Sequence, residues 1–177
     1  PLLPDGSPMP NDAKFPNQGT TQTKVNARVD WQGKPGHLWS AYGELADSSG
    51  IVYTPTGPNA LADSGSYTTF AGLTYSSDPL EAKVYWTRAR GDTQSVLFGD
   101  DFHATANTVV GDVVGRRALG TRHALSAGGT VTLSAFDLTL APGDSFRSAV
   151  GGFAEDQIAI TPKATWTLGA RVDKFDT

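Results

Sequence analysis

The chain has 177 residues with no cysteine, only three histidines and no long run of apolar residues. Without cysteine it forms neither a disulfide nor a thiolate metal site. No stretch near its start resembles a signal-peptide core, and none elsewhere reaches the length of a membrane-spanning helix. The absence of cysteine agrees with a reducing compartment. We therefore expect synthesis in the cytoplasm and no membrane partner.

Charge is also scarce. Charged residues make up 18% of the chain, and the net charge is -4 with a pI near 5.2. Nucleic acids and anionic membranes are bound through a basic face that neutralises phosphates. The composition therefore argues against either as a partner.

What the sequence has is alternation. In residues 24–31 the apolar Val25, Ala27, Val29 and Trp31 alternate with polar residues, which is typical of a half-buried strand. Trp166, Leu168, Ala170 and Val172 alternate in the same way, and both tryptophans are expected to be buried. Further strands are expected at residues 37–42, 51–53, 67–75, 82–88, 95–98, 104–110, 113–119, 131–140, 145–150 and 157–160.

This pattern predicts an all-β fold, either an antiparallel β-sandwich or a jelly roll, over residues 24–177. Residues 43–65, rich in turn signals, are expected to be long surface loops. Val131 and Leu133 occupy odd positions whereas Phe136 and Leu138 occupy even ones. A bulge near Ala135 would explain that change of phase.

Residues 1–23 are expected to be an extended N-terminal arm. Five of the 11 prolines lie here, at Pro1, Pro4, Pro8, Pro10 and Pro16. Proline lacks a backbone donor and fixes φ, so the segment suits neither a helix nor a central strand. The apolar residues of the arm could dock on a partner, although a disordered tail would look the same. They are Leu2, Leu3, Met9 and Phe15.

Signs of catalysis or metal binding are weak. Asp101 and His103 would project from one face of a strand, but zinc needs at least three protein ligands. No nucleophile elbow, phosphate loop or calcium-binding ladder occurs. Arg90-Gly91-Asp92 spells the integrin tripeptide, which we interpret as a coincidental turn after Ala89. We expect no enzyme, no cofactor and no metal.

Aromatic residues offer another function. Sugar-binding modules stack exposed aromatic rings on pyranose faces. The candidates near the expected loops are Trp39, Tyr42, Tyr53 and Tyr67. A carbohydrate-binding or host-surface adhesion module is therefore the alternative function, and behind it stands a hydrolase whose site the sequence does not reveal.

The cysteine-free chain, its Pro-rich arm and its Gly/Thr/Ser/Ala-rich composition resemble virion proteins of tailed bacteriophages, such as decoration and small tail or fibre proteins. The segment from Val131 to Phe146 is similar to late hairpins in jelly-roll heads of phage fibres and of the tumour-necrosis-factor-like superfamily. The resemblance implies a non-enzymatic virion subunit in symmetric copies, a homo-oligomer that contacts other virion subunits or a host glycan. It carries over no catalytic residue.

Overall fold

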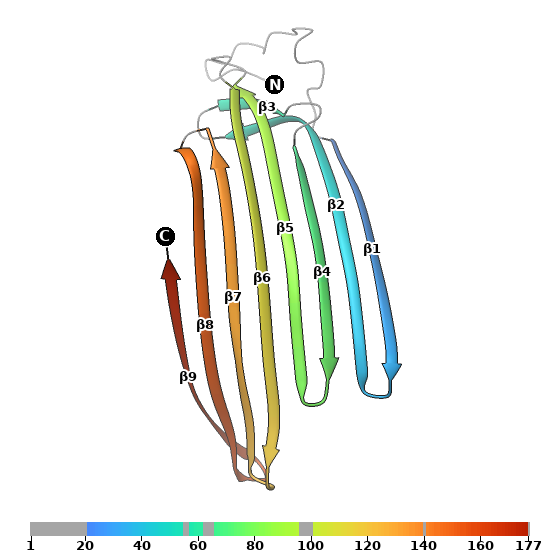
Figure 1. Cartoon of the computed structure of the whole chain (residues 1–177), viewed down its shortest axis with the longest axis vertical. Helices are drawn as coiled ribbons and strands as arrows, with labels where there is room; N and C mark the ends of the chain where they lie inside the picture. The colour runs from blue at the N-terminus through green and yellow to red at the C-terminus, as the bar shows by residue number, and fades with distance from the viewer. Residues whose placement is uncertain (1–20, 55–56, 62–65, 96–100, 140, 177) are drawn as a thin grey trace.

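The computed structural model describes residues 21–54, 57–61, 66–95, 101–139 and 141–176. These residues form nine strands and no helix (Figure 1). The strands are β1 (Thr21–Lys34), β2 (His37–Thr54), β3 (Gly57–Leu61), β4 (Tyr67–Ser77), β5 (Leu80–Ser95), β6 (Asp101–Leu119), β7 (His123–Leu138), β8 (Ala141–Thr161) and β9 (Ala164–Asp176).

All pairings are antiparallel, and one sheet contains every strand. Along most of its length the order is β1-β2-β4-β5-β6-β7-β8-β9, with short β3 inserted between the far ends of β2 and β5. Hairpins therefore join nearly all neighbours, as expected when consecutive strands pair. The antiparallel all-β prediction is confirmed.

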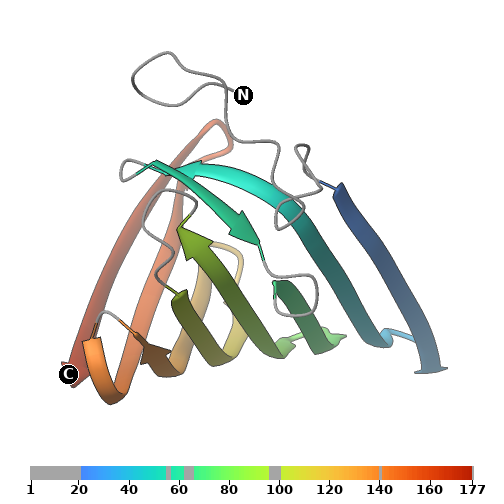
Figure 2. The ribbon, with the colours of Figure 1, turned by 90° about the horizontal axis from the view of Figure 1, so that it is seen from above.

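The expected sandwich is not seen. The described residues form one open, curved sheet with no second layer facing it, and β1 and β9 are its free edges (Figure 2). Ala46 and Val110 are the buried apolar residues of this part of the chain. Trp31 and Trp166, expected to be core residues, are 63% and 65% exposed. Period-two alternation shows that a strand has an apolar face, but it does not show what covers that face.

β2 is much longer than expected because the turn signals after Gly43 do not end it. The strand pairs with β1 as far as Ser49 and with β4 as far as Asp47, and then its partner becomes β3. Gly50 lies at this change of partner with a φ of 122°, a conformation that side chains disfavour. The glycine thus permits the strand to bend where loops were predicted.

The bulge predicted at Ala135 is wrong in position. Pairing of β6 with β7 runs without a break from Ala104↔Leu138 to Leu119↔His123. The register with β8 shifts only between Phe136 and Leu138. Phe136 therefore points to the face opposite Leu133, where the Arg147 guanidinium lies 5.7 Å from its ring centroid. The phase change reflects an aromatic ring on the second face of a regular strand.

Candidate functional site: the two faces of the sheet

The two faces of the sheet differ sharply in chemistry. Residues directly opposite one another across the strands form register rows, and each row shares one face. One such row is Trp31, Trp39, Tyr75, Ala82, Val113, Gly129, Gly152 and Val172. The next row towards the β3 end is Val29, Ala41, Leu73, Val84, Gly111, Val131, Val150 and Lys174. Apart from Lys174, these rows contain no charge.

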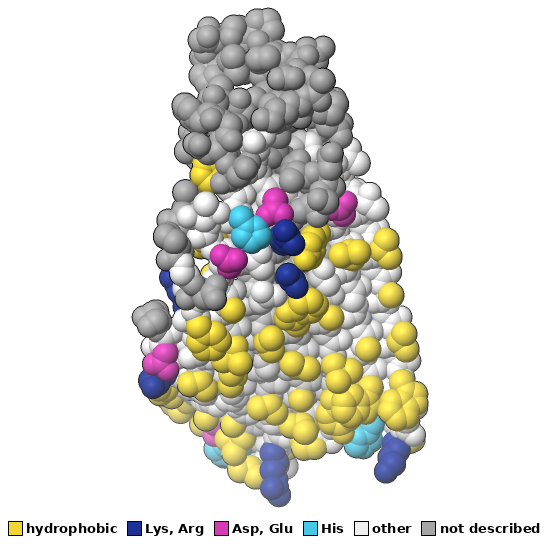
Figure 3. Space-filling view, turned by 45° about the horizontal axis from the view of Figure 1, so that its top comes forward, with side chains coloured by type: hydrophobic (Ala, Val, Ile, Leu, Met, Phe, Trp, Pro, Cys, Tyr) yellow, Lys and Arg dark blue, Asp and Glu magenta, His cyan; other side chains and the backbone are white. Residues whose placement is uncertain are grey.

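This apolar face is the convex one. Hydrophobic side chains spread across it in Figure 3, with charged side chains near its two ends. The large hydrophobic residues that are exposed in the described sheet belong to this face, except for Leu38, Leu138 and Phe175. On β7, Val131 is 45% exposed, whereas its neighbour Thr132 on the other face is less so. The apolar side chains are thus more exposed than the polar ones, whereas a water-soluble sheet buries its apolar face and exposes its polar face.

Aromatic residues lie at the hairpin end of the apolar face, which is the end with the β1–β2, β4–β5, β6–β7 and β8–β9 turns. Trp31 pairs with Trp39, and the rings of Trp39 and Tyr75 lie 4.6 Å apart. Trp166 occupies the corresponding end of β9. Close by, the His123 ring lies 2.7 Å from a carboxylate oxygen of Asp156. This end of the face therefore changes from aliphatic to aromatic and polar side chains.

The opposite boundary is a polar row. It consists of Thr23, Asp47, Tyr67, Arg90, Thr105 and Asp137. The row lies on the same convex face as the tryptophans, because the pairing stays in phase across all these strands. The apolar band is therefore bounded on both sides along the strands.

The band crosses the sheet diagonally. Trp31 on β1 shares a row with Val172 on β9, but the band on β9 continues to Trp166, six residues earlier (172 minus 166). Six residues are about 20 Å of strand, and eight neighbouring strands are about 34 Å wide. The strands are thus tilted by roughly 30° against the band.

Along the strands the band covers Val25 to Trp31 on β1 and Leu125 to Ala135 on β7. These stretches are about 20 to 33 Å long. Corrected for the tilt, the band is about 17 to 29 Å high.

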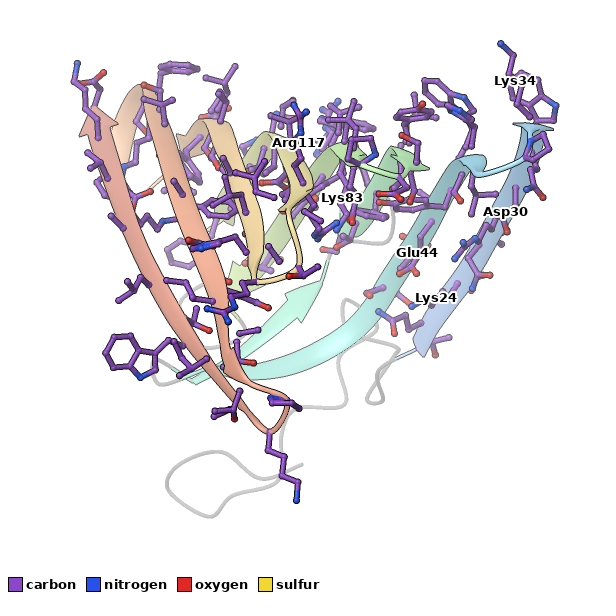
Figure 4. All side chains as sticks on the ribbon, turned by 90° about the horizontal axis from the view of Figure 1, so that it is seen from below. Lys24, Asp30, Lys34, Glu44, Lys83 and Arg117 are labelled. Atoms are coloured by element: carbon purple, nitrogen blue, oxygen red, sulfur yellow. The ribbon has the colours of Figure 1, made fainter. Side chains whose placement is uncertain are left out.

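The concave face is polar. Figure 4 shows Lys24, Glu44 and Lys83 in the hollow of the sheet. Ion pairs cross this face from strand to strand or along one strand: Lys24–Glu44 at 2.8 Å, Lys83–Glu81 at 2.7 Å, Arg28–Asp30 at 2.9 Å and Arg171–Asp173 at 2.8 Å. The hydroxyl of Thr130 donates to Asp112 at 2.6 Å.

Three aromatic rings also lie on the concave face. Tyr42 is 5.3 Å from Phe70, and Phe70 is 5.9 Å from Tyr85, measured between ring centroids. The ring of Tyr42 covers Gly72, because a Cβ built there would lie 2.6 Å from it. The concave face thus carries polar groups around a small aromatic cluster.

A second polar cluster lies on the convex face at the polar row. His103 donates from Nδ1 to the Asp92 carboxylate, and its Nε2 lies 3.6 Å from Asp137. Arg90 binds Asp92 at 2.9 Å. The hydrogen bond from His103, and then Arg90, holds the pKa of the Asp92 carboxyl below its ordinary value. Asp92 is therefore the shared anion of this cluster.

This cluster corrects the interpretation of the Arg-Gly-Asp tripeptide. β5 continues to Ser95, and Gly91 pairs with Ala104 of β6 in an unbroken ladder. Arg90 and Asp92 therefore project from one face of a strand and bind each other. The even spacing of Trp86, Arg88, Arg90 and Asp92 was the sequence signal that the strand continues.

The glycan candidates do not converge. Trp39 lies on the convex face at the hairpin end, Tyr42 lies in the hollow, and Tyr67 lies in the polar row near the other end. Tyr53 pairs with Pro58 at the far end of β2. Trp39 and Tyr42 differ by an odd number of positions, which already places them on opposite faces.

Other predicted residues have different outcomes. Leu2, Leu3, Met9 and Phe15 lie outside the described residues, so their docking stays a prediction. His103 does project from a strand face, beside Asp92 and Asp137 rather than in a metal-binding group. The described part of the chain holds no group of three or more His, Asp or Glu residues that could bind a metal ion.

Comparison with known proteins gives no relative. No family model, curated protein or solved structure matches the chain. Among the described residues there is also no helix long and apolar enough to span a membrane.

Proposed function

We propose that this sheet is embedded in a lipid membrane, with its convex face against the acyl chains and its concave face lining a water-filled space. The observation that carries the proposal is the inverted distribution of side chains. Strands of a membrane-embedded sheet alternate between apolar residues that face lipid and polar residues that face the interior. All eight long strands follow this rule in one common phase.

Energetics support a cover on the convex face. Burial of a large aliphatic or aromatic side chain contributes about 1.5 to 3 kcal/mol. A folded domain is stable by only about 5 to 15 kcal/mol in total. Val29, Leu45, Trp31, Leu168 and Val172 are among the side chains left mostly exposed on the bare sheet. Something must therefore cover this face, since the sheet alone buries too little apolar surface.

Dimensions favour lipid as that cover. The hydrocarbon layer of a bilayer is about 30 Å thick, and apolar bands of transmembrane strands are about 25 Å high. The band here is of similar height, and its strands have a tilt near that of transmembrane strands, about 35 to 45°. Aromatic residues such as Trp31 and Trp166 lie at its edge, where their amphipathic rings suit the interface between lipid and water.

The proposal departs from the expectation that the chain has no membrane partner. That expectation rested on net charge and on the lack of a long apolar run. A strand, however, needs an apolar residue only at every second position, so it crosses the hydrocarbon without any apolar run. Net charge also says little here, because many of the charges lie in the hollow as ion pairs.

A virion subunit remains the second candidate, because neighbouring subunits could also cover the convex face. Protein interfaces, however, have a limited apolar core surrounded by a polar rim. The apolar band here crosses every long strand, from Val25 on β1 to Val172 on β9, and its charged side chains, such as Asp156 opposite Leu168, lie near its two boundaries. This continuous band is why we favour lipid.

The test is refolding with and without lipid. Chain unfolded in urea is diluted either into buffer or into phospholipid vesicles, and its far-ultraviolet circular dichroism and flotation with the vesicles are measured. We expect a β spectrum and flotation only with vesicles. A soluble oligomer with a β spectrum in buffer, unable to float with vesicles, would overturn the proposal and support the virion subunit.

A further inference from the structure

A pocket lies on the convex face where the apolar band meets the polar row. Its volume is about 580 Å³. Basic and polar side chains line one part of it, and apolar groups line the other. Its lining includes Arg88, Arg90, His103, Asn107, Ala135 and Phe146.

Among the described residues, Arg88 is the cation of this pocket that has no carboxylate partner. The two other basic residues are already matched, because Arg90 and His103 both bind Asp92. The Arg88 guanidinium instead lies 5.9 Å from the centroid of the Tyr67 ring. Its Nε is buried and has no hydrogen-bond partner among the described residues. A buried donor on a charged group without an acceptor is costly, which points to an anionic ligand.

The rows around Arg88 show what kind of ligand fits. Arg88, Asn107, Ala135 and Phe146 form one row, and the row below it contains Trp86, Val109 and Leu133. Polar donors therefore lie directly above an apolar surface on the same face. A molecule with an anionic head and a hydrocarbon tail matches that order.

We propose that this pocket binds the phosphate of a membrane lipid headgroup, with Arg88 as the main phosphate contact and the acyl chain lying along Leu133 and Phe146. This inference rests on the proposed membrane embedding. Guanidinium groups bind phosphate oxygens through charge-assisted hydrogen bonds. The Asn107 amide can donate a further hydrogen bond. The carboxylate of Asp137, 3.6 Å from His103 Nε2, also lines the pocket.

The experiment uses the whole chain folded in detergent micelles, with its fold checked by circular dichroism before every titration. Short-chain phosphatidic acid is titrated, and retained lipid is measured by native mass spectrometry. Short-chain diacylglycerol tests the tail without the phosphate, and inorganic phosphate tests the anion without the tail. We expect one tightly bound phosphatidic acid and much weaker binding of the other two probes.

The variants are Arg88→Gln and the control Arg117→Gln. Arg117 lies on the same convex face at the hairpin end, away from the pocket. Arg88→Gln should weaken phosphatidic acid binding by about 10-fold or more, since a hydrogen bond to a charged group is lost. Arg117→Gln should leave it unchanged.

Equal affinities in both variants, or equal binding of diacylglycerol, would overturn this inference while the protein still floats with vesicles. Binding of inorganic phosphate as tight as that of the lipid would also overturn it, because the ligand would then be a free anion. Failure to float with vesicles is a different result, since it overturns the proposed function itself.

Discussion

The environment of a single residue in this sheet depends on which side of its strand the side chain occupies. Val131 and Thr132 are chain neighbours in the central strand β7, yet Val131 lies in the apolar band and Thr132 faces the hollow. Thr132 also lies two positions from Thr130, the partner of Asp112. Under the proposed membrane embedding, a lysine introduced at position 131 would face lipid, and a lysine introduced at position 132 would face the water-filled side.

We predict that Val131→Lys lowers the free energy of unfolding in vesicles by about 2 to 4 kcal/mol, the usual cost of a lysine facing the bilayer midplane. Thr132→Lys should cost less, because its side chain lies on the concave face and its ammonium group can approach the carboxylate of Asp112, the partner of Thr130 in the adjacent row. Urea titrations followed by tryptophan fluorescence measure both values. If the convex face met water, Val131→Lys would change stability by only about 0.5 kcal/mol.

Glycines of the two faces give a second comparison. A Cβ built on Gly128, on the concave side, would collide with the backbone carbonyl of Val113 and lie 2.8 Å from the Phe153 ring. A Cβ built on Gly111, on the convex side, would meet nothing within 4 Å. Neighbouring atoms are therefore packed closely around Gly128 on the concave face, whereas the space beside Gly111 on the convex face is open.

Gly128→Ala should destabilise the protein by about 1 to 3 kcal/mol, because a backbone oxygen cannot move aside as a flexible side chain can. Gly111→Ala should be neutral or stabilise by up to about 1 kcal/mol through the unfolded state. Unfolding midpoints in the same detergent provide the measurement. Equal losses in the two variants would mean that the hollow is not packed as described.

At the scale of elements, alternation predicted the strand class well and the strand ends poorly. Residues 24–31 lie in β1, and the alternating residues from Trp166 to Val172 lie in β9, as expected. β2 and β5 run beyond their expected ends, since Gly50 and Gly91 stay within strands instead of starting turns. Pairing partners on both sides hold these glycines in the ladder, and a local turn preference does not include that contribution.

The candidate site was largely beyond prediction from sequence for a related reason. His103 lies 11 residues from Asp92 along the chain, and they meet because β5 and β6 pair in a particular register. The register between two strands cannot be predicted from the local amino-acid composition of either strand. The convex position of all four tryptophans was also hidden, because an apolar face looks the same in sequence whether protein or lipid covers it.

At the scale of the whole molecule, one sheet separates an apolar convex face from a polar hollow (Figures 2 and 4). The edge strands β1 and β9 leave their outer backbone groups without partners among the described residues. Unpaired backbone groups are costly in hydrocarbon. Within a membrane both edges therefore require further strand pairing.

The most direct test compares two adjacent positions of β5, Val84 in the middle of the apolar band and Tyr85 in the hollow. All four native tryptophans are replaced by Phe, and a single tryptophan is introduced as Val84→Trp or as Tyr85→Trp. Each variant is refolded in vesicles that contain lipids brominated at mid-chain, and quenching by these lipids and by aqueous iodide is recorded.

We expect the tryptophan at position 84 to be quenched by the brominated lipid and shielded from iodide, and the tryptophan at position 85 not to be quenched by the lipid. Adjacent residues of one strand would then report two different solvents. Iodide quenching of both tryptophans, with no quenching of position 84 by mid-chain bromine, would contradict the membrane-embedded sheet.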